Sequence, residues 1–321
     1  MENITKNDTL HVFQGQEVKE TGRQCFFKGF SETLQLNYFY YSNFALTPVT
    51  ILLASWCFLS NGFVLLMFIR GKLQLRAGFY CLCSLTTTDV LWSGLVIPLY
   101  VSFRIKELLI GRACANKSDW DNPIMVTSFF LCVFSTVGTL GVMSVDRYLA
   151  VSKPMWYKVV IKNRHIITAC CGVWLITLVM VILKQIVFFP RKVVELFEAC
   201  YMVICSSLII VFQLFTLLGL RRHNNGVANL VEGSAQRNNR GNALERKLAI
   251  LTRHVVGLLG IILIPVCILV VVSNILRTNL SPFAEPLYFT LATLCSGINP
   301  VLYYRGNSQI RQGITSLVKC H

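Results

Sequence analysis

The chain has 321 residues, of which 54% are hydrophobic and only 14% are charged, and its formal net charge is +15. So apolar a composition is atypical of a soluble domain and indicates that much of the chain is solvated by lipid. The sequence carries no metal-ligand spacing, nucleophile elbow or phosphate-binding loop, so no enzyme is expected. It offers no basic soluble domain for nucleic acid either, so no nucleic-acid partner is expected.

Seven apolar stretches follow one another along the chain. A helix that crosses the hydrocarbon layer needs about 20 mostly apolar residues. The stretches cover residues 45–69, 77–103, 122–146, 166–183, 199–220, 254–276 and 286–304. We therefore predict an all-α integral membrane protein, a seven-transmembrane helix bundle over residues 45–304. An extracellular N-terminal segment, 1–44, would precede it, and a cytoplasmic tail, 305–321, would follow it.

The connections are short except for residues 221–247, which are rich in Asn, Gly and Arg. That composition predicts a mobile cytoplasmic loop. After the last stretch, Ile310, Ile314 and Leu317 recur at helical spacing, which predicts a short amphipathic helix on the inner leaflet. Cys320 follows that helix and could carry a palmitoyl anchor or remain a free thiol.

Charge and glycosylation signals predict the orientation. If the first connection lies inside, the cytoplasmic segments hold 18 Lys and Arg residues against three acidic ones, as the positive-inside rule requires. This surplus would also attract the anionic lipid of the inner leaflet. Asn-x-Ser/Thr acceptors are useful only outside, and all four such sites fall in the outer segments. They begin at Asn3, Asn7, Asn116 and Asn279. We expect a multi-pass plasma-membrane glycoprotein with its N-terminus outside the cell.

Charged residues inside or at the edge of the apolar stretches are candidates for function. Asp89 lies in the middle of the second stretch, and Asp146 and Arg147 close the third. A charge at membrane depth is costly unless it is paired or solvated. Pro265 and Pro300 lie within later stretches, where a missing backbone donor permits a kink.

The chain resembles the rhodopsin-like class of G-protein-coupled receptors through all seven stretches in order. The third stretch ends in Asp146-Arg147-Tyr148, and the seventh carries Asn299-Pro300-Val301-Leu302-Tyr303, similar to the family's Asn-Pro-x-x-Tyr. The family's single-residue markers are matched by Asn61, Val64, Asp89, Trp174 and Pro265. The resemblance implies a receptor that transmits the binding of an extracellular ligand to a heterotrimeric G protein.

Two other readings stay open at this point, a membrane transporter and a seven-helix protein that does not signal. A transporter would call for discontinuous helices or inverted repeats with polar sites at the midplane. The sequence has no such repeat, and its polar midplane residues gather around Asp89.

In the family, the arginine of the third helix often pairs with an acidic residue at the inner start of the sixth helix. Glu245, twenty residues before Pro265, stands where that partner is expected. Breaking the pair would let the sixth helix move outward and admit a helix of the G protein. The alternative is that Arg147 merely reaches the lipid phosphates.

The resemblance also implies a sodium site around Asp89. Its oxygen ligands would come from Asp89, Thr136, Ser296 and Asn299, with Asn61 close by. Cys132 and Cys295 stand where many relatives have asparagine. A protonated Asp89 without an ion is the alternative, and no other cofactor is expected.

The outer half of the bundle is where the family binds its ligands. The corresponding positions hold Phe129, Phe130, Val133, Val266, Phe289 and Thr293. Phe129 stands where amine receptors carry an aspartate, and residues 286–304 contain no lysine for a retinal Schiff base. We expect an apolar or amphipathic small molecule, or the hydrophobic end of a peptide. Ordinary helix packing explains a Phe-rich stripe equally well.

The chain departs from the family in several places. The cysteine expected at the outer end of the third helix would fall at Asn122, so we predict a disulfide from Cys114 to Cys200, with Cys25 as competitor. Leu263 stands where a tryptophan is common. Residues 143–157 are similar to chemosensory receptors and 79–98 to prostanoid receptors, so no subfamily is assigned.

Overall fold

The computed structural model describes residues 32–70, 77–110, 123–185, 191–228 and 281–306, together with residues 257, 260 and 311. Within these ranges all regular structure is helical. In chain order the elements are α2 (Glu32–Ile69), α3 (Ala77–Leu91), the π-helical turn η1 (Trp92–Val96), α4 (Ile97–Ile110), α6 (Pro123–Ser152), α7 (Pro154–Val160), α8 (Asn163–Gln185), α9 (Arg191–Ala228) and α11 (Ser281–Gly306).

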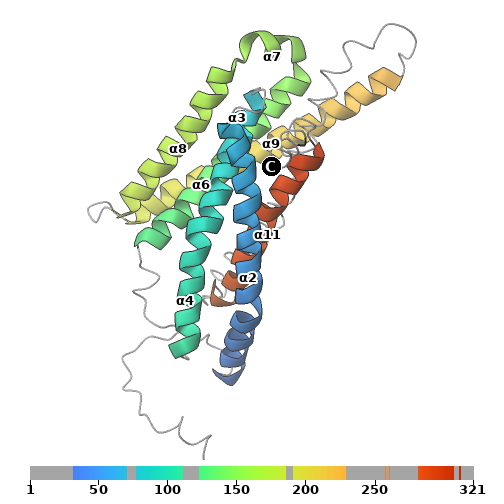
Figure 1. The fold of residues 1–321 in the computed structure, drawn as a ribbon. Helices are drawn as coiled ribbons and strands as arrows, with labels where there is room; N and C mark the ends of the chain where they lie inside the picture. The colour runs from blue at the N-terminus through green and yellow to red at the C-terminus, as the bar shows by residue number, and fades with distance from the viewer. Residues whose placement is uncertain are drawn as a thin grey trace, which may run out of the picture.

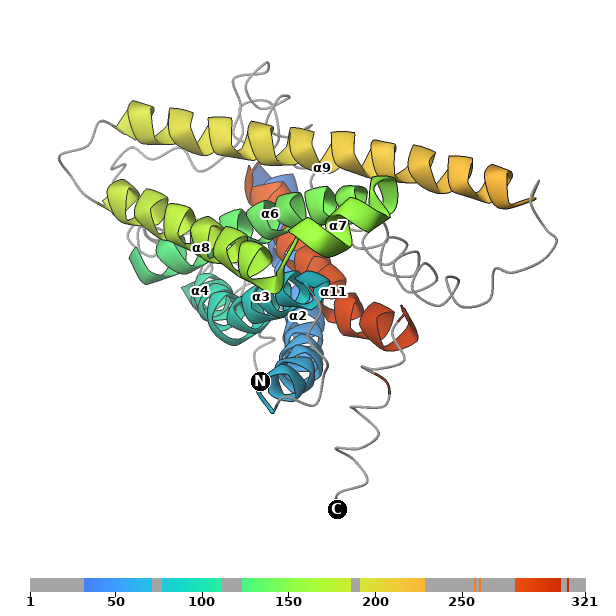
Figure 2. The same ribbon diagram turned by 90° about the horizontal axis from the view of Figure 1, so that it is seen from above.

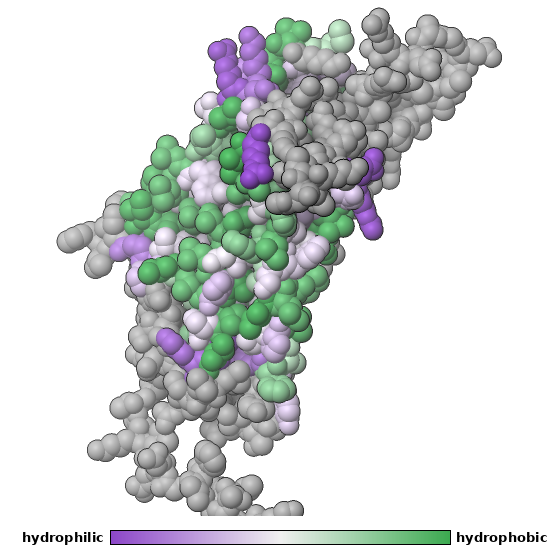
Figure 3. All heavy atoms as spheres, viewed as in Figure 1, coloured by the Kyte–Doolittle hydropathy of each residue, from purple (hydrophilic) through white to green (hydrophobic). Residues whose placement is uncertain are grey.

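Five parts of these helices are long and apolar enough to cross a membrane. They are Tyr41–Ile69, Gly78–Lys106, Pro123–Ser152, Asn163–Gln185 and Leu196–Gly219. Each coincides with one of the first five predicted stretches, and α11 covers the seventh. The sixth stretch, the Asn/Gly/Arg-rich loop beyond residue 228 and nearly all of the tail lie outside the described residues. In Figure 3, hydrophobic side chains cover the middle of the visible face and hydrophilic ones gather toward its two ends.

Two helices extend well past their predicted bounds. α2 begins at Glu32, inside the segment predicted to precede the bundle. α9 runs to Ala228, so the first eight residues of the predicted loop 221–247 are helical, and the prediction was wrong there. Once a helix is nucleated, each added residue gains a backbone hydrogen bond, so it can continue through polar sequence.

α6 is the central helix of the described bundle, since it contacts α3, α8 and α9. α2 lies on the other side of α3 and packs along α11. Figure 1 shows α2, α3, α4 and α11 as one group, with α6, α8 and α9 inclined beside them. Figure 2 shows α9 lying across the α6 side of the molecule, steeply inclined to α2. The bundle has two ends: the Arg147 end, where α6 ends, and the Arg104 end, where α4 ends.

Buried apolar side chains form two clusters along the bundle. The cluster at the Arg147 end includes Met67, Phe79 and Tyr303. The cluster toward the Arg104 end includes Trp92, Tyr100 and Phe289. The polar level of Asp89 lies between them.

The π-helical turn η1 lies between α3 and α4. Pro98 has no backbone N–H to donate to the carbonyl of Gly94, and its ring would clash with that carbonyl in a regular helix. The chain widens instead, and the Ile97 N–H bonds to the Trp92 carbonyl five residues back. One extra residue in a turn rotates everything after it by about 100° around the helix axis. This rotation sets the direction in which Tyr100 and Arg104 point.

Candidate functional site

Asp146 and Arg147 lie near the end of α6, and both are buried. The guanidinium of Arg147 donates to Asp146 Oδ2 through Nε at 2.9 Å and also through Nη2. The hydroxyl of Tyr157, on α7, donates to Asp146 Oδ1 at 2.5 Å. Hydrogen bonds with a charged partner are stronger than neutral ones. Asp146 therefore holds the arginine and ties α7 to α6.

The start of α3 lies directly against this arginine. A Cβ at Gly78 would overlap Arg147 Nη2 and lie 3.0 Å from Arg147 Cζ. Tyr148 faces α9 instead, where its ring centroid lies 5.2 Å from that of Phe212 and 5.7 Å from that of Phe215. The adjacent residues Arg147 and Tyr148 therefore contact different helices.

Asp89 forms the polar centre of the bundle. Its side chain lies among α3, α2 and α11, and its Oδ2 accepts a hydrogen bond from Asn299 Nδ2 at 2.9 Å. The Thr136 hydroxyl donates to Thr88, next to Asp89, at 3.2 Å. The structure thus brings together Asp89 and Asn299, and it places Thr136 against Thr88, the residue next to Asp89.

Pro300 explains why α2 is bonded to α11 at this level. A proline cannot donate to the carbonyl four residues earlier, which is that of Ser296. The amide of Asn61 donates to this carbonyl at 3.1 Å, and the Trp56 indole donates to the Gly297 carbonyl at 3.0 Å. Such replacement bonds are what permits a proline in a membrane helix. Tyr303 follows one turn later and is fully buried.

Trp174 connects three helices. Its indole N–H, on α8, donates to Ser84 Oγ of α3 at 2.9 Å, and Ser84 shares a hydrogen bond of 3.0 Å with Thr139 of α6. Trp174 is half-buried, and an indole N–H inside a membrane bundle needs a hydrogen-bond partner. These hydrogen bonds explain why a tryptophan is suited to position 174, which the sequence analysis had marked as a family position.

α6 and α9 approach closely at Gly138. The Tyr201 hydroxyl donates to the carbonyl of Phe134 at 3.1 Å. A Cβ at Gly138 would overlap that hydroxyl and lie 2.7 Å from Val173 Cγ1 of α8. The missing side chain therefore lets a tyrosine reach the backbone of α6.

Five aromatic rings pack together toward the Arg104 end. Phe289 stacks on Trp92, with centroids 5.5 Å apart, and on Tyr100, at 3.9 Å. Phe129 lies 5.6 Å from Phe289 and 6.2 Å from Tyr288. Offset and edge contacts of this kind each add to the stability given by burial alone. The rings come from η1, α4, α6 and α11.

This cluster contains most of the predicted pocket residues that the structure describes. Phe129, Val133 and Phe289 pack in it. Thr293 belongs to it as well, because its Oγ1 accepts the Trp92 indole N–H at 3.1 Å. A polar group buried among aromatic rings is thus already hydrogen-bonded.

Phe130 lies on a different side of α6. Its ring contacts Phe134 at 5.5 Å and is covered by Lys184 Nζ, which lies 3.4 Å from the ring centroid. Lys184 also bonds both carboxylate oxygens of Glu198, each at 2.9 Å. Phe130 therefore joins α6 to α8 and α9, and it also touches Phe129 edge-on at 5.3 Å.

A buried ion pair lies beside the aromatic cluster. Arg104 Nη2 of α4 lies 2.8 Å from Glu285 Oε1 of α11, and Arg104 Nε donates to the Tyr100 hydroxyl at 3.0 Å. The Arg104 side chain is 2% exposed and that of Glu285 is 19% exposed. The guanidinium also lies over the rings of Tyr100 and Phe103, at 5.2 and 5.9 Å.

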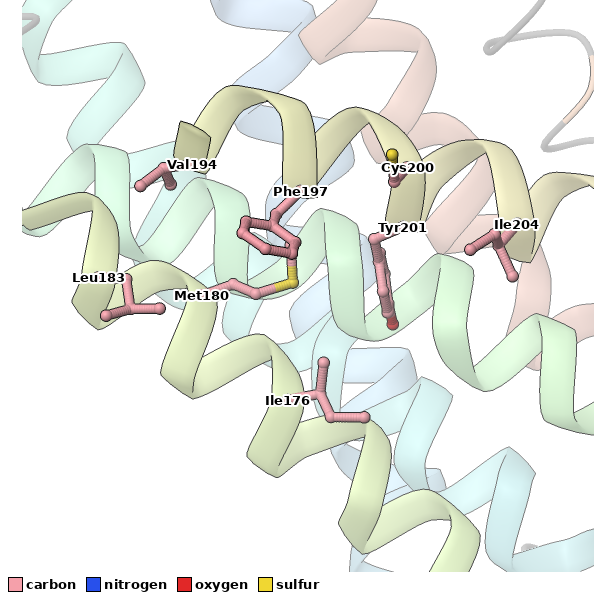
Figure 4. Close-up of a pocket in the computed structure, with 8 residues that line it drawn as sticks. All are labelled: Ile176, Met180, Leu183, Val194, Phe197, Cys200, Tyr201 and Ile204. Atoms are coloured by element: carbon pink, nitrogen blue, oxygen red, sulfur yellow. The ribbon is translucent and has the colours of Figure 1, made fainter. Parts of the chain in front are cut away.

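An apolar hollow of about 350 Å³ lies between α8 and α9. Met180 of α8 and Phe197 of α9 point toward each other across it, while Cys200 points away from α8 (Figure 4). Its walls belong to two helices that are each long and apolar enough to cross a membrane.

Residues 60–303 match the model of the 7 transmembrane receptor (rhodopsin family). The chain belongs to this family. It is 22% identical to cannabinoid receptor 1 of Xenopus laevis over 210 residues, which are 59% of the chain and 42% of that receptor. It is 28% identical to the alpha-1A adrenergic receptor of Oryzias latipes over 103 residues, 32% of the chain and 20% of that receptor. It is 23% identical to cannabinoid receptor 1 of Taricha granulosa over 141 residues, 42% of the chain and 27% of that receptor.

The match confirms the predicted family and the seven-helix membrane architecture, and it disfavours a transporter. The aligned parts span less than half the length of the relatives named. The family match covers three regions of the receptor described above: the Arg147 end, the level of Asp89 and the aromatic cluster.

Several predicted residues of this receptor lie outside the described residues. They are Glu245, Pro265, Val266, Cys114, Cys320 and the acceptors Asn3, Asn7, Asn116 and Asn279. Cys200 is described, and its thiol is exposed and free. The disulfide from Cys114 to Cys200 therefore stays a prediction.

The sequence did not single out Trp92, Tyr100, Arg104, Glu285 or Tyr157. The sequence could have revealed Arg104 as a charge within a membrane helix. The second predicted stretch ends at residue 103, one position before Arg104, whereas the helix continues to residue 110. Its pairing with Glu285 could not have been found, because the two residues are 181 positions apart.

Proposed function

We propose that this receptor lies in the plasma membrane with its N-terminus outside the cell. It binds an extracellular ligand toward the Arg104 end and activates a heterotrimeric G protein at the Arg147 end. The contact that carries the proposal is the buried group of Asp146, Arg147 and Tyr157, because it holds a permanent cation in place with bonds that can be exchanged.

The arginine is the moving part of this proposal. Asp146 neutralises Arg147 within one helix, so releasing Arg147 requires only a change of side-chain position. A freed guanidinium presents several donors to a carbonyl or a carboxylate of a partner. Glu245 would be the competing partner in the resting receptor. Tyr148 lies against α9 and would report a movement of that helix.

The aromatic cluster supports an apolar or amphipathic ligand. Ligand sites are mostly apolar with a few polar groups that fix orientation. Phe129 and Phe289 supply the apolar surface, and Thr293, which accepts a hydrogen bond from Trp92, is the polar group among them. Val266 and Phe130 would complete the wall.

A sodium ion at Asp89 fits the residues present. Hard cations prefer oxygen ligands, and the buried Oδ1 of Asn61 has no hydrogen-bond partner among the described residues. Asp89, Thr136, Ser296 and Asn299 would hold the ion.

Three kinds of modification complete the proposal. Asn3, Asn7, Asn116 and Asn279 would carry glycans outside the cell, a disulfide would join Cys114 to Cys200, and Cys320 would carry a palmitoyl group on a short amphipathic helix.

The test is guanine-nucleotide exchange on a panel of purified heterotrimeric G proteins, using membranes that contain the wild type or the Arg147→Ala variant. Arg164→Ala is the matched control, because Arg164 is an exposed arginine of α8. We expect basal or ligand-stimulated exchange in the wild type and in the control, and its loss in Arg147→Ala. Equal exchange in all three, or none by properly inserted protein, would refute coupling through this arginine.

A further inference from the structure

We propose that the ligand of this receptor carries an anionic group, a carboxylate on an apolar body, and that Arg104 binds it in place of Glu285. The inference rests on the proposed function, because it names the chemical class of ligand for the same aromatic cluster. It is carried by a buried ion pair next to that cluster.

The first observation is the burial of Arg104. A guanidinium withdrawn from water inside a membrane span is costly, and its pairing with one carboxylate roughly repays that cost without a net gain. Buried ionisable groups in membrane helices mark binding sites more often than sites of stability. Arg104 is 2% exposed although it lies near the end of α4.

The second observation is that the guanidinium is fixed before any ligand arrives. Its Nε donates to the Tyr100 hydroxyl at 3.0 Å, and its Cζ lies over the Tyr100 ring. The Tyr100 ring in turn stacks on Phe289 at 3.9 Å. A charged head bound by Arg104 would therefore leave an attached apolar body against Phe289. Preorganisation of this kind increases affinity because little freedom is lost on binding.

The third observation is that Glu285 is the replaceable member of the pair. Its side chain is 19% exposed, and it reaches Arg104 from the first turns of α11. A ligand carboxylate has the same charge and the same geometry as the Glu285 carboxylate. The exchange conserves the pairing of Arg104, so it leaves no buried cation without a counter-ion.

Asn43 adds a second polar group near this level. It lies seven residues before Thr50 on α2, and Thr50 bonds to Thr290 of α11 at 2.7 Å. Seven residues of helix rise about 10 Å and the five from Thr290 to Glu285 about 7.5 Å, so Asn43 and Glu285 lie at similar heights. The Asn43 amide is fully buried and has no hydrogen-bond partner in the described part of the chain.

A cationic ligand is the opposite possibility, and the geometry disfavours it. A bound amine would take Glu285 from Arg104 and leave a deeply buried guanidinium without that carboxylate. Breaking a buried pair in this way is strongly unfavourable. The ion pair of Arg104 and Glu285 therefore favours an anionic ligand over a cationic one.

The experiment measures ligand binding without a G protein. The purified full-length receptor in detergent is heated with medium-chain and long-chain fatty acids and arylalkanoic acids, each compared with its methyl ester and with the amine of the same skeleton. Binding raises the midpoint of thermal unfolding. We expect some carboxylates, but not their esters or amines, to stabilise the wild type.

Three variants locate the binding. Arg104→Gln with Glu285→Gln removes both charges of this ion pair together, so it should fold and bind the carboxylates about tenfold or more weakly. Glu285→Gln alone removes the competing carboxylate and should bind them more tightly than the wild type. Arg164→Gln is the matched control, because it removes the charge of an arginine that is exposed on α8, and it should bind as the wild type does.

Three outcomes would overturn the inference: stabilisation by esters as strong as by acids, stabilisation by amines through Glu285, or none by any carboxylate. The proposed function fails separately. If carboxylates bind but Arg147→Ala leaves exchange unchanged, the inference stands and the coupling proposal falls. If exchange depends on Arg147 but no carboxylate binds, only the inference falls.

Discussion

The two ends of the bundle each hold a buried arginine, but they hold it in different ways. At the Arg147 end, the carboxylate that binds the guanidinium belongs to the preceding residue, Asp146. At the Arg104 end, the carboxylate comes from Glu285 on another helix, 181 positions along the chain. The first pair is set by local sequence and the second by the packing of α4 on α11.

This difference bears on function. A pair within one helix does not depend on the separation of two helices, so Arg147 keeps Asp146 as its counter-ion when helices move apart. A pair between helices responds to any change in their separation. The structure thus combines a pair within one helix at one end with a pair between two helices at the other end.

The largest effect is expected where the pair joins two helices. Arg104→Gln leaves Glu285 without its cation and should lower the free energy of unfolding by up to about 3 kcal/mol, less than for a fully buried partner because Glu285 retains some exposure. Adding Glu285→Gln should restore most of the loss. Thermal unfolding of the purified receptor measures both, and equal losses in the single and double variants would show that the pair is not coupled.

Two glycines of α6 test how closely α9 packs against α6 in the middle of the bundle. Gly138→Ala places a Cβ against Tyr201 and Val173 and should cost about 1–3 kcal/mol through overpacking. Gly141→Ala is the control, since its nearest atom would lie 3.9 Å away, and it should be neutral or stabilising. The midpoint of thermal unfolding measures this, and similar midpoints for the two variants would argue against the close approach of α9.

A smaller effect is expected for the bond that ties α7 to Asp146. Tyr157→Phe removes a donor from a buried carboxylate and should cost about 1 kcal/mol. Tyr304→Phe, at an exposed tyrosine of α11, is the control and should unfold at the wild-type temperature. A wild-type midpoint for Tyr157→Phe would mean that this hydrogen bond contributes little.

The smallest change in stability should accompany a change in signalling. Gly78→Ala displaces only the end of the flexible Arg147 side chain, so the cost in stability should stay below about 1 kcal/mol. Because the shift weakens the bonds to Asp146, basal nucleotide exchange should rise several-fold. Gly172→Ala, with open space around its Cβ, should leave exchange unchanged. Unchanged exchange in Gly78→Ala would separate the position of Arg147 from activation.

The sequence predicted most of the described helices well. Their apolar length placed the first five spans, since lipid requires continuous helices of a minimum length. It misjudged the extents of α2 and α9, because a helix can continue into water and hydropathy reports only the part in lipid. It found Asp89 as a charge inside an apolar stretch and Asn299 through the resemblance, and the structure adds that Asn61 bonds to the carbonyl that Pro300 leaves open.

By itself, the sequence determined the membrane class, the family and the local groups. These depend on apolar length and on neighbouring residues such as Asp146 and Arg147, which are fixed once the helix forms. Only the tertiary structure decided that Arg104 meets Glu285, that Tyr201 reaches the backbone of α6 past Gly138, and that five rings converge beside Phe289. Those contacts depend on the rotation of each helix about its axis, which a π-helical turn or a proline can change without altering the apolar pattern.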